Sequence, residues 1–171
     1  MNKILKGFYI FLILAAIFAA GAVAGRHFVH QHLTFVATIG ESMMPTLPNQ
    51  AVYEAAPPTS LERGDIVTLI DVQGTMICKR IVGMPGETIG ITNGVVYLNG
   101  QVLKEPYLAK YTKTSILYPA GPEIKAGTGY IVMGDNRQIS YDSRAFGPVK
   151  FSDIKEKLRI YTLEAKTINK P

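Results

Sequence analysis

A serine and a lysine stand out as residues that could act together as a nucleophile and its base. Ser42 lies in the run GESMMPT at positions 40–46, between a predicted strand and Pro45, where the chain is expected to turn. A serine hydroxyl is a poor nucleophile at neutral pH and needs an adjacent base. The chain's three histidines all fall within seven residues of an apolar segment ending at residue 25, so they are unattractive bases for this serine.

Lys79 is the better candidate for the base. It lies in a predicted strand over residues 75–82, where alternate residues share a face, so Ile77 and Ile81 are its neighbours. Aliphatic neighbours desolvate an ammonium group and lower its pKa, and a neutral amine could take the proton of Ser42. Spacing alone favours a plainer alternative, in which the lysine reaches solvent from a half-exposed strand.

A third segment, residues 134–149, is the densest polar cluster in the chain. Ser140, Asp142 and Arg144 share parity, so an extended path would place them on one face. Asp142 and Arg144 could then pair, and Ser140 could offer a hydrogen bond. The alternative for the same residues is a solvated, charged loop.

The amino-terminal region predicts a membrane anchor. No charged residue occurs from Gly7 to Gly25, and nineteen helical residues rise about 28 Å, close to the thickness of a bilayer's hydrocarbon core. Lys3 and Lys6 precede the segment, which predicts a cytoplasmic amino terminus. A secretory signal cleaved after Ala24 is the rival interpretation, but the apolar run is longer than such signals usually have. We therefore expect a cytoplasmic tail (1–6), an anchor (7–25) and an extracytoplasmic domain (26–171).

Composition narrows the classes of function. The formal net charge is +5, and the two lysines before the apolar segment supply part of it. There is no long basic run, so nucleic acid is not an expected partner, whereas a mild positive surplus suits a site beside anionic lipid. The single cysteine, Cys78, excludes a disulfide within the chain and is expected to be a small buried apolar residue. No metal site and no cofactor are predicted.

The remainder predicts a mainly β domain of antiparallel strands. Strand candidates cover residues 33–39, 65–70, 75–82, 95–98, 130–133 and 158–163. Asn93-Gly94 and Asn99-Gly100 bracket one of them and favour tight hairpin turns. Residues 152–158 are mildly helical in pattern, and residues 103–129 predict a small insertion or long loop outside the main sheet.

Four segments, in this order, resemble the sequence boxes of type I signal peptidases: GESMMPTL (40–47), GDIVTL (64–69), KRIVGMPGE (79–87) and GDNRQISYDSRAFGPV (134–149). The resemblance implies a serine protease with a Ser–Lys dyad. Ser42 would form an acyl-enzyme, and Lys79 would take the hydroxyl proton and later activate water. By the same resemblance, supporting roles fall to Ser140 (orienting the lysine), Asp142 and Arg144 (a structural ion pair), Met43 (beside the nucleophile) and Arg80 (following the lysine).

The implied function is removal of amino-terminal signal peptides from exported precursors with small residues at the first and third positions before the cut. The precursor would bind as an added β-strand. The implied location is the cell membrane, with one span and the catalytic domain on the extracytoplasmic side, and membrane lipid is a further partner. The Ser42 N–H would be one oxyanion donor. Many family members have a serine two residues before the nucleophile as the second donor, but this chain has Gly40, so that donor stays open.

Three other functions remain in view. A specialised peptidase for conjugative transfer or pilin processing would use the same chemistry on a narrow substrate. A self-cleaving regulator of the LexA type shares the Ser–Lys logic but should have a DNA-binding helical domain and no membrane span. A non-catalytic, membrane-anchored β-domain would keep its function after loss of Ser42 and Lys79.

Overall fold

The computed structural model describes residues 14–19, 21, 34–110, 112–115 and 123–160. The chain divides into two units, Met1–Thr34 and Phe35–Pro171. In the first unit, residues 14–19 and 21 are helical. None of the helices in the described part of the chain is long and apolar enough to span a bilayer. Most of the predicted anchor, and all of the predicted cytoplasmic tail, lie outside the described residues.

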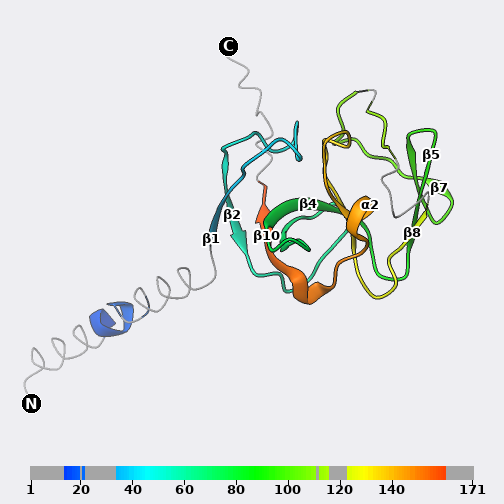
Figure 1. The fold of residues 1–171 in the computed structure, drawn as a ribbon. Coiled ribbons are helices and arrows are strands. Elements are labelled where there is room, and N and C mark those ends of the chain that lie inside the picture. The colour runs from blue at the N-terminus through cyan, green and yellow to red at the C-terminus, as the bar shows by residue number, and fades with distance from the viewer. Residues whose placement is uncertain (1–13, 20, 22–33, 111, 116–122, 161–171) are drawn as a thin grey trace, which may run out of the picture. The chain divides into compact units, whose positions relative to one another are not determined.

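A six-stranded sheet (Figure 1) carries Lys79 in one of its strands, and Ser42 lies in the turn that follows another. Its strand order is β1-β2-β10-β3-β4-β9, and the pairs β10–β2, β10–β3, β3–β4 and β4–β9 are antiparallel. The prediction of a mainly β, antiparallel domain is confirmed. The strands are β1 (Thr34–Ala37), β2 (Val52–Ala56), β3 (Ile66–Ile70), β4 (Met76–Gly83), β9 (Ile131–Met133) and β10 (Ile154–Arg159).

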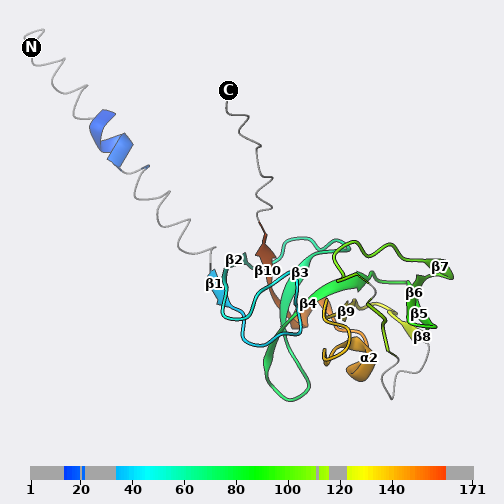
Figure 2. The same ribbon diagram turned by 90° about the horizontal axis from the view of Figure 1, so that it is seen from above.

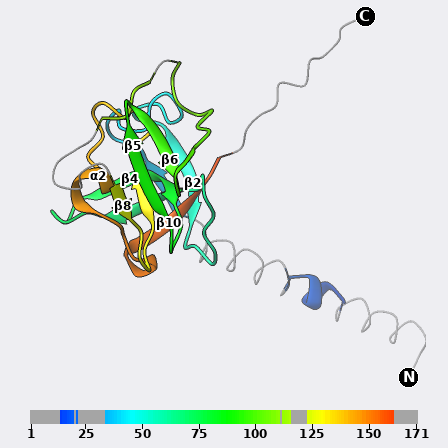
Figure 3. The same ribbon diagram turned by 90° about the vertical axis from the view of Figure 1, so that its right-hand side faces the viewer.

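A second sheet of four strands has the order β7-β6-β5-β8 (Figure 3). Its strands are β5 (Thr88–Thr92), β6 (Val95–Leu98), β7 (Gln101–Val102) and β8 (Glu123–Lys125). Both predicted Asn-Gly turns are present: Asn93 and Gly94 have φ of 51° and 83°, and Asn99 and Gly100 have φ of 49° and 82°. Two consecutive positive φ angles make the tight turn that suits a two-residue hairpin.

The excursion from the main sheet therefore begins earlier than the predicted insertion at 103–129. It starts at β5, and β8, inside that range, pairs with β5 as an edge of the second sheet. Strands β5, β6 and β7 are joined by short turns, whereas a long connection separates β7 from β8 in the chain. The composition of the residues between β7 and β8 is typical of a loop, so the sequence pattern does not predict that β8 pairs with β5.

The helical pattern predicted for residues 152–158 is wrong. A short 3-10 helix, η1, covers only Phe151–Asp153, and the following residues form β10 between β2 and β3. Ile154 and Leu158 are four apart, which imitates one face of a helix. A register shift between Ile154 and Glu156 instead turns these two side chains toward different core clusters.

Strand β4 is the centre of the domain, because its two faces serve different parts of the core. Ile81 packs in one cluster with Val67 and Val132, while Val82 packs in another with Ile89 from the second sheet. Both β4 and β9 thus contribute to the packing that joins the two sheets, and Figure 2 shows β4 running from β3 toward the second sheet. Because both faces of β4 pack against other parts of the core, the strand is fixed in place, and so is the backbone of each residue on it.

Candidate active site

Ser42 lies in the tight turn that follows β1. Met43 and Leu47 are 3% and 1% exposed, and they anchor this turn in the core cluster that includes Ala55 and Leu158. The amide of Leu47 donates to the Met43 carbonyl at 2.9 Å, which closes the turn. Ser42 itself is half-buried, so its hydroxyl is held at the surface of the core by its neighbours.

Lys79 brings its amine to this serine from the middle of β4. Its Nζ donates to Ser42 Oγ at 2.9 Å and to the Cys78 carbonyl at 2.8 Å. The residue is 3% exposed, which excludes the alternative of a lysine reaching solvent. Val67 lies directly opposite on β3, so the stem packs within an aliphatic face.

The surroundings of Lys79 make its neutral amine more accessible than that of an exposed lysine. Burial lowers its pKa below the ordinary lysine value, and the more distant charge of Asp142 opposes this shift. No ion pair to Lys79 is formed by any carboxylate in the described part of the chain. The amine is therefore without an ion-pair partner in the described part of the chain.

Arg80, the next residue, holds the loop after β9. Its Nε and Nη2 donate to the two carboxylate oxygens of Asp135 at 2.8 and 2.6 Å, and its Nη1 donates to the Gly64 carbonyl at 2.8 Å. Thr46, in the turn that carries Ser42, also donates its hydroxyl to Asp135. Sequence reasoning named Arg80 but missed Asp135 and Thr46, which lie far from it in the chain.

Asp142 and Arg144 form an ion pair, but not along an extended path. Asp142 caps the short helix α2 (Ser143–Phe146), and its carboxylate accepts from the backbone N–H, Nε and Nη2 of Arg144 at 3.1, 2.8 and 2.8 Å. The same carboxylate accepts from the Gly134 N–H at 3.0 Å. Both side chains are almost fully buried, so the alternative of a solvated loop is excluded. The pair supports the loop after β9.

Ser140 lies against this loop without the predicted contact to the lysine. It is 3% exposed, and its Oγ has no hydrogen-bond partner among the described residues. Gly134 packs directly against it: a Cβ added at Gly134 would lie 2.5 Å from the Ser140 Cβ and 2.5 Å from the Ser42 carbonyl oxygen. The orienting role of Ser140 stays a prediction.

The loop after β9 also holds the backbone of the serine. The Asn136 N–H donates to the Ser42 carbonyl at 3.0 Å. The segment of residues 134–136 therefore touches Ser42 directly and is itself held by Arg80 and Asp142. This contact joins the first and third of the sequence motifs.

The backbone N–H of Gly40 is already engaged in a hydrogen bond. Its N–H donates to Asn49 Oδ1 at 2.9 Å, and its φ is 102°. This φ lies in the region that favours glycine, so a serine at this position would be strained.

A cavity of about 440 Å³ opens beside the dyad. Residues 36–40 line it from β1 and the start of the turn, and residues 75–79 line it from the hairpin and β4. Cys78 is among the lining residues and is half-buried, and burial raises the pKa of its thiol to about 12. The thiol is protonated at neutral pH and is inert as a nucleophile. Much of the lining is aliphatic, including Val36, Ile39, Met43, Leu47 and Ile77.

No group of three or more His, Cys, Asp or Glu side chains in the described residues is arranged to hold a metal ion. The site consists of a hydroxyl, an amine and a hydrogen-bonded scaffold. This arrangement can perform nucleophilic acyl transfer with a lysine base.

Comparison with known proteins gives consistent matches. The family described as signal peptidase, peptidase S26, matches residues 5–162. Signal peptidase I of Leptolyngbya laminosa is 35% identical over 141 residues, covering 71% of this chain and 66% of that protein. Signal peptidase I S of Bacillus subtilis is 38% identical over 116 residues, covering 61% of this chain and 62% of that protein. Each alignment thus spans just under two thirds of the relative's own length.

A crystal structure of a signal peptidase I from Enterococcus faecalis aligns with a TM-score of 0.49 and 30% sequence identity, covering 59% of this chain and 98% of that one. The assignment of a family depends on the sequence match, which extends over most of the chain. The chain belongs to the signal peptidase family, peptidase S26.

Proposed function

We propose that this protein is a signal peptidase I, a serine endopeptidase that removes amino-terminal signal peptides from exported precursors. The observation that carries the proposal is the 2.9 Å hydrogen bond between Lys79 Nζ and Ser42 Oγ, with the lysine 3% exposed. Membership of the peptidase S26 family supports the same chemistry. The two residues lie 37 positions apart in the chain, and the fold places them in contact.

In the proposed reaction, Ser42 Oγ attacks the carbonyl carbon of the scissile peptide bond while neutral Lys79 takes the hydroxyl proton. The tetrahedral intermediate collapses as the peptide C–N bond breaks, and Lys79 returns the proton to the leaving amine. Water then attacks the acyl-enzyme and gives its proton to Lys79. The carboxylate product leaves, and Ser42 regains its hydroxyl proton.

The backbone of Ser42 is proposed to supply one oxyanion donor through its N–H. The Gly40 N–H is not proposed as the second oxyanion donor, because it already donates to Asn49. Met43 is proposed to hold the nucleophile by anchoring the turn, since it is 3% exposed. Arg80, Asp142 and Arg144 are proposed as supports of the loop that contacts the Ser42 carbonyl.

The cavity beside the dyad is proposed to receive the residues before the cut. Strand β1 is an edge of the six-stranded sheet and lines the cavity, so an extended precursor segment can add beside it. Aliphatic walls favour small apolar side chains over charged ones. This supports a preference for small residues at the first and third positions before the cut.

The charge-free run from Gly7 to Gly25 supports a membrane location. We propose a single-pass anchor in the cell membrane with residues 26–171 on the extracytoplasmic side. Precursors carry apolar signal segments at the same surface, so the anchor raises the local concentration of substrate.

The test is cleavage of a signal-peptide-bearing precursor in detergent by the wild type, Ser42→Ala and Lys79→Ala. Both variants should lose nearly all turnover while still folding, because each removes one member of the dyad. Lys125→Ala is the matched control, since Lys125 is exposed on β8 in the second sheet. Retained turnover in Lys79→Ala would remove the lysine from the mechanism, and retained turnover in Ser42→Ala would exclude the serine protease.

A further inference from the structure

One short segment of the connection between β7 and β8, within the second sheet, reaches the loop that contacts Ser42. Glu105 accepts hydrogen bonds from Arg137 Nη1 at 3.0 Å and from Arg137 Nη2. The hydroxyl of Tyr107 donates to the same carboxylate at 2.7 Å. The side chains of Arg137 and Glu105 are 0% and 7% exposed, so this ion pair lies inside the domain.

Arg137 links Glu105 to the loop after β9. Its Nε donates to the Gly134 carbonyl at 3.0 Å, and its own carbonyl accepts from Arg144 Nη1 at 2.8 Å. Its Nη1 also donates to Thr114 at 2.8 Å. The guanidinium is thus held between Glu105 on one side and the Gly134 carbonyl on the other, which fixes the loop at residues 134–137.

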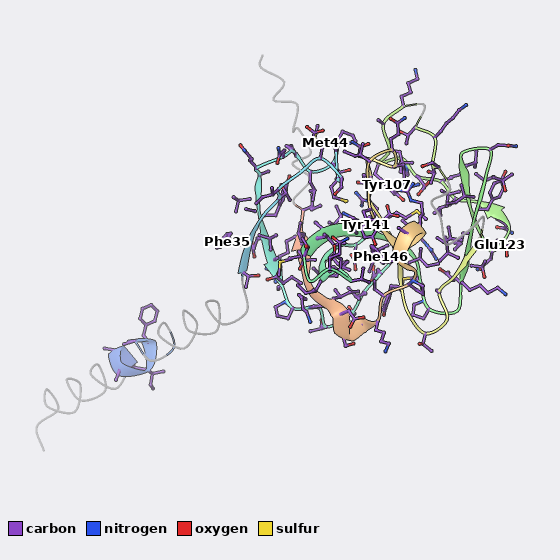
Figure 4. The ribbon with its side chains drawn as sticks, viewed as in Figure 1. Phe35, Met44, Tyr107, Glu123, Tyr141 and Phe146 are labelled. Atoms are coloured by element: carbon purple, nitrogen blue, oxygen red, sulfur yellow. The ribbon has the colours of Figure 1, made fainter. Side chains whose placement is uncertain are left out.

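Tyr107 reaches the second arginine of the site. Its ring centroid lies 4.1 Å from the guanidinium carbon of Arg80, which is a cation–π contact. Burial, followed by the charge of Glu105, raises the pKa of Tyr107, so its hydroxyl stays protonated and keeps donating. Tyr107 is half-buried, and Figure 4 labels it in the upper part of the β domain, where Met44 of the turn that carries Ser42 is also labelled.

From these contacts, and resting on the proposed function, we propose that Glu105 and Tyr107 are positioning residues for the reaction. They contact Arg137 and Arg80, which bond to Gly134 and Asp135, and the Asn136 N–H of the same loop donates to the Ser42 carbonyl at 3.0 Å. Neither residue lines the cavity beside the dyad. Their loss should therefore displace the nucleophile and lower kcat, with little change in the binding of the precursor.

The experiment measures kcat, KM and the pH dependence of precursor cleavage by the full chain in detergent. Glu105→Gln and Tyr107→Leu should each lower kcat about tenfold or more and change KM less than about twofold. Tyr107→Phe keeps the ring over Arg80 and loses only the hydroxyl contact, so its loss of kcat should be smaller. Glu123→Gln and Tyr97→Phe, in the second sheet, are matched controls that should keep wild-type kcat.

A double variant separates positioning from a general loss of stability. If Glu105 acts through Arg137, then adding Glu105→Gln to Arg137→Lys should lower kcat much less than it does in the wild type. The pH midpoint of kcat should stay unchanged in every variant, because neither residue contacts Lys79. Should Glu105→Gln fail to fold, Tyr107→Leu and Tyr107→Phe decide the question by the same measurements.

Three results would overturn the inference: a raised KM at constant kcat, equal losses in the controls, or additive effects of the Glu105 and Arg137 changes. If the wild type itself does not cleave precursors, the proposed function fails. If the wild type cleaves and the Glu105 and Tyr107 variants match it, only the positioning roles fail.

Discussion

At the scale of single residues, the chemistry depends on one amine that is kept from water. A lysine in solution at pH 8 is neutral in only about 0.4% of molecules, given its ordinary pKa near 10.4. Burial of Lys79 lowers its pKa, so at neutral pH a larger fraction of its amine is neutral than in an exposed lysine. The hydrogen bond from Nζ to Ser42 Oγ holds the proposed base next to the hydroxyl whose proton it would take.

The pH dependence of cleavage follows from this direction of shift. The proposed base works only when deprotonated, so kcat/KM should rise with pH through the pKa of Lys79 in the free enzyme. The midpoint should fall below the ordinary lysine value, because burial disfavours the ammonium form and so lowers the pKa of Lys79. Initial rates at low precursor concentration between pH 5 and pH 10 measure the midpoint. An optimum on the acid side would instead indicate a histidine base.

At the scale of elements, three segments converge on one glycine. Gly134 follows β9, its N–H donates to Asp142, and its Cα packs against the backbone of Ser42 and the side chain of Ser140. The turn after β1, the loop after β9 and the start of α2 can approach this closely only because position 134 has no side chain. Close packing of these elements sets where the nucleophile lies.

Gly134→Ala should therefore impair both activity and stability. Its Cβ would lie 2.5 Å from the Ser42 carbonyl oxygen, so the turn that carries the nucleophile must move. We expect kcat to fall about a hundredfold, as misplacement of a reacting group by about 1 Å can cause, and the free energy of unfolding to fall by about 1–3 kcal/mol. Precursor cleavage and denaturant unfolding measure the two effects.

Gly100→Ala is the matched control for this substitution. Gly100 has φ of 82° in the hairpin between β6 and β7, and a Cβ there would meet open space. The alanine should cost about 1–2 kcal/mol of stability through its backbone conformation alone, with kcat unchanged. Equal losses of kcat in the two variants would show that stability, not the position of Ser42, limits cleavage.

At the scale of the whole molecule, a β domain with the proposed active site follows a charge-free amino-terminal segment. The described part of that segment is helical and presents exposed apolar side chains, with Leu14, Ile17 and Phe18 between 59% and 81% exposed. Apolar side chains of this kind are stable in a bilayer and costly in water. The apolar segment therefore suits a bilayer, which supports the proposed anchor.

The proposed anchor is tested by placing charges in this run. The double variant Leu14→Lys, Ile17→Lys should bind vesicles much more weakly than the wild type, because each lysine near the centre of a span costs about 3 kcal/mol. Flotation with lipid vesicles after an alkaline wash measures binding, and Leu14→Ala, Ile17→Ala is the conservative control. Cleavage of a precursor in detergent should be unchanged. Equal flotation of all three proteins would contradict the anchor.

Much of the local structure was determined by the sequence itself. The two Asn-Gly turns formed where they were expected, because both residues tolerate the positive φ that a two-residue hairpin needs. β4 was also predicted closely, since its β-branched residues favour a strand. The four ordered motifs predict the family, and the same motifs predict Ser42 and Lys79 as the candidate dyad.

Only the tertiary structure decided how those residues are held. The partners of the site are separated by 55 positions for Arg80 and Asp135 and by 32 for Arg137 and Glu105, and no local pattern encodes such pairings. The register shift in β10 likewise depends on neighbouring strands. It explains why the apolar residues of this strand have the four-residue spacing that is typical of a helix. Turn chemistry acts over a few residues and can be read directly from sequence, whereas burial of Lys79 and the hydrogen bond that fixes the Ser42 carbonyl arise from packing among distant segments.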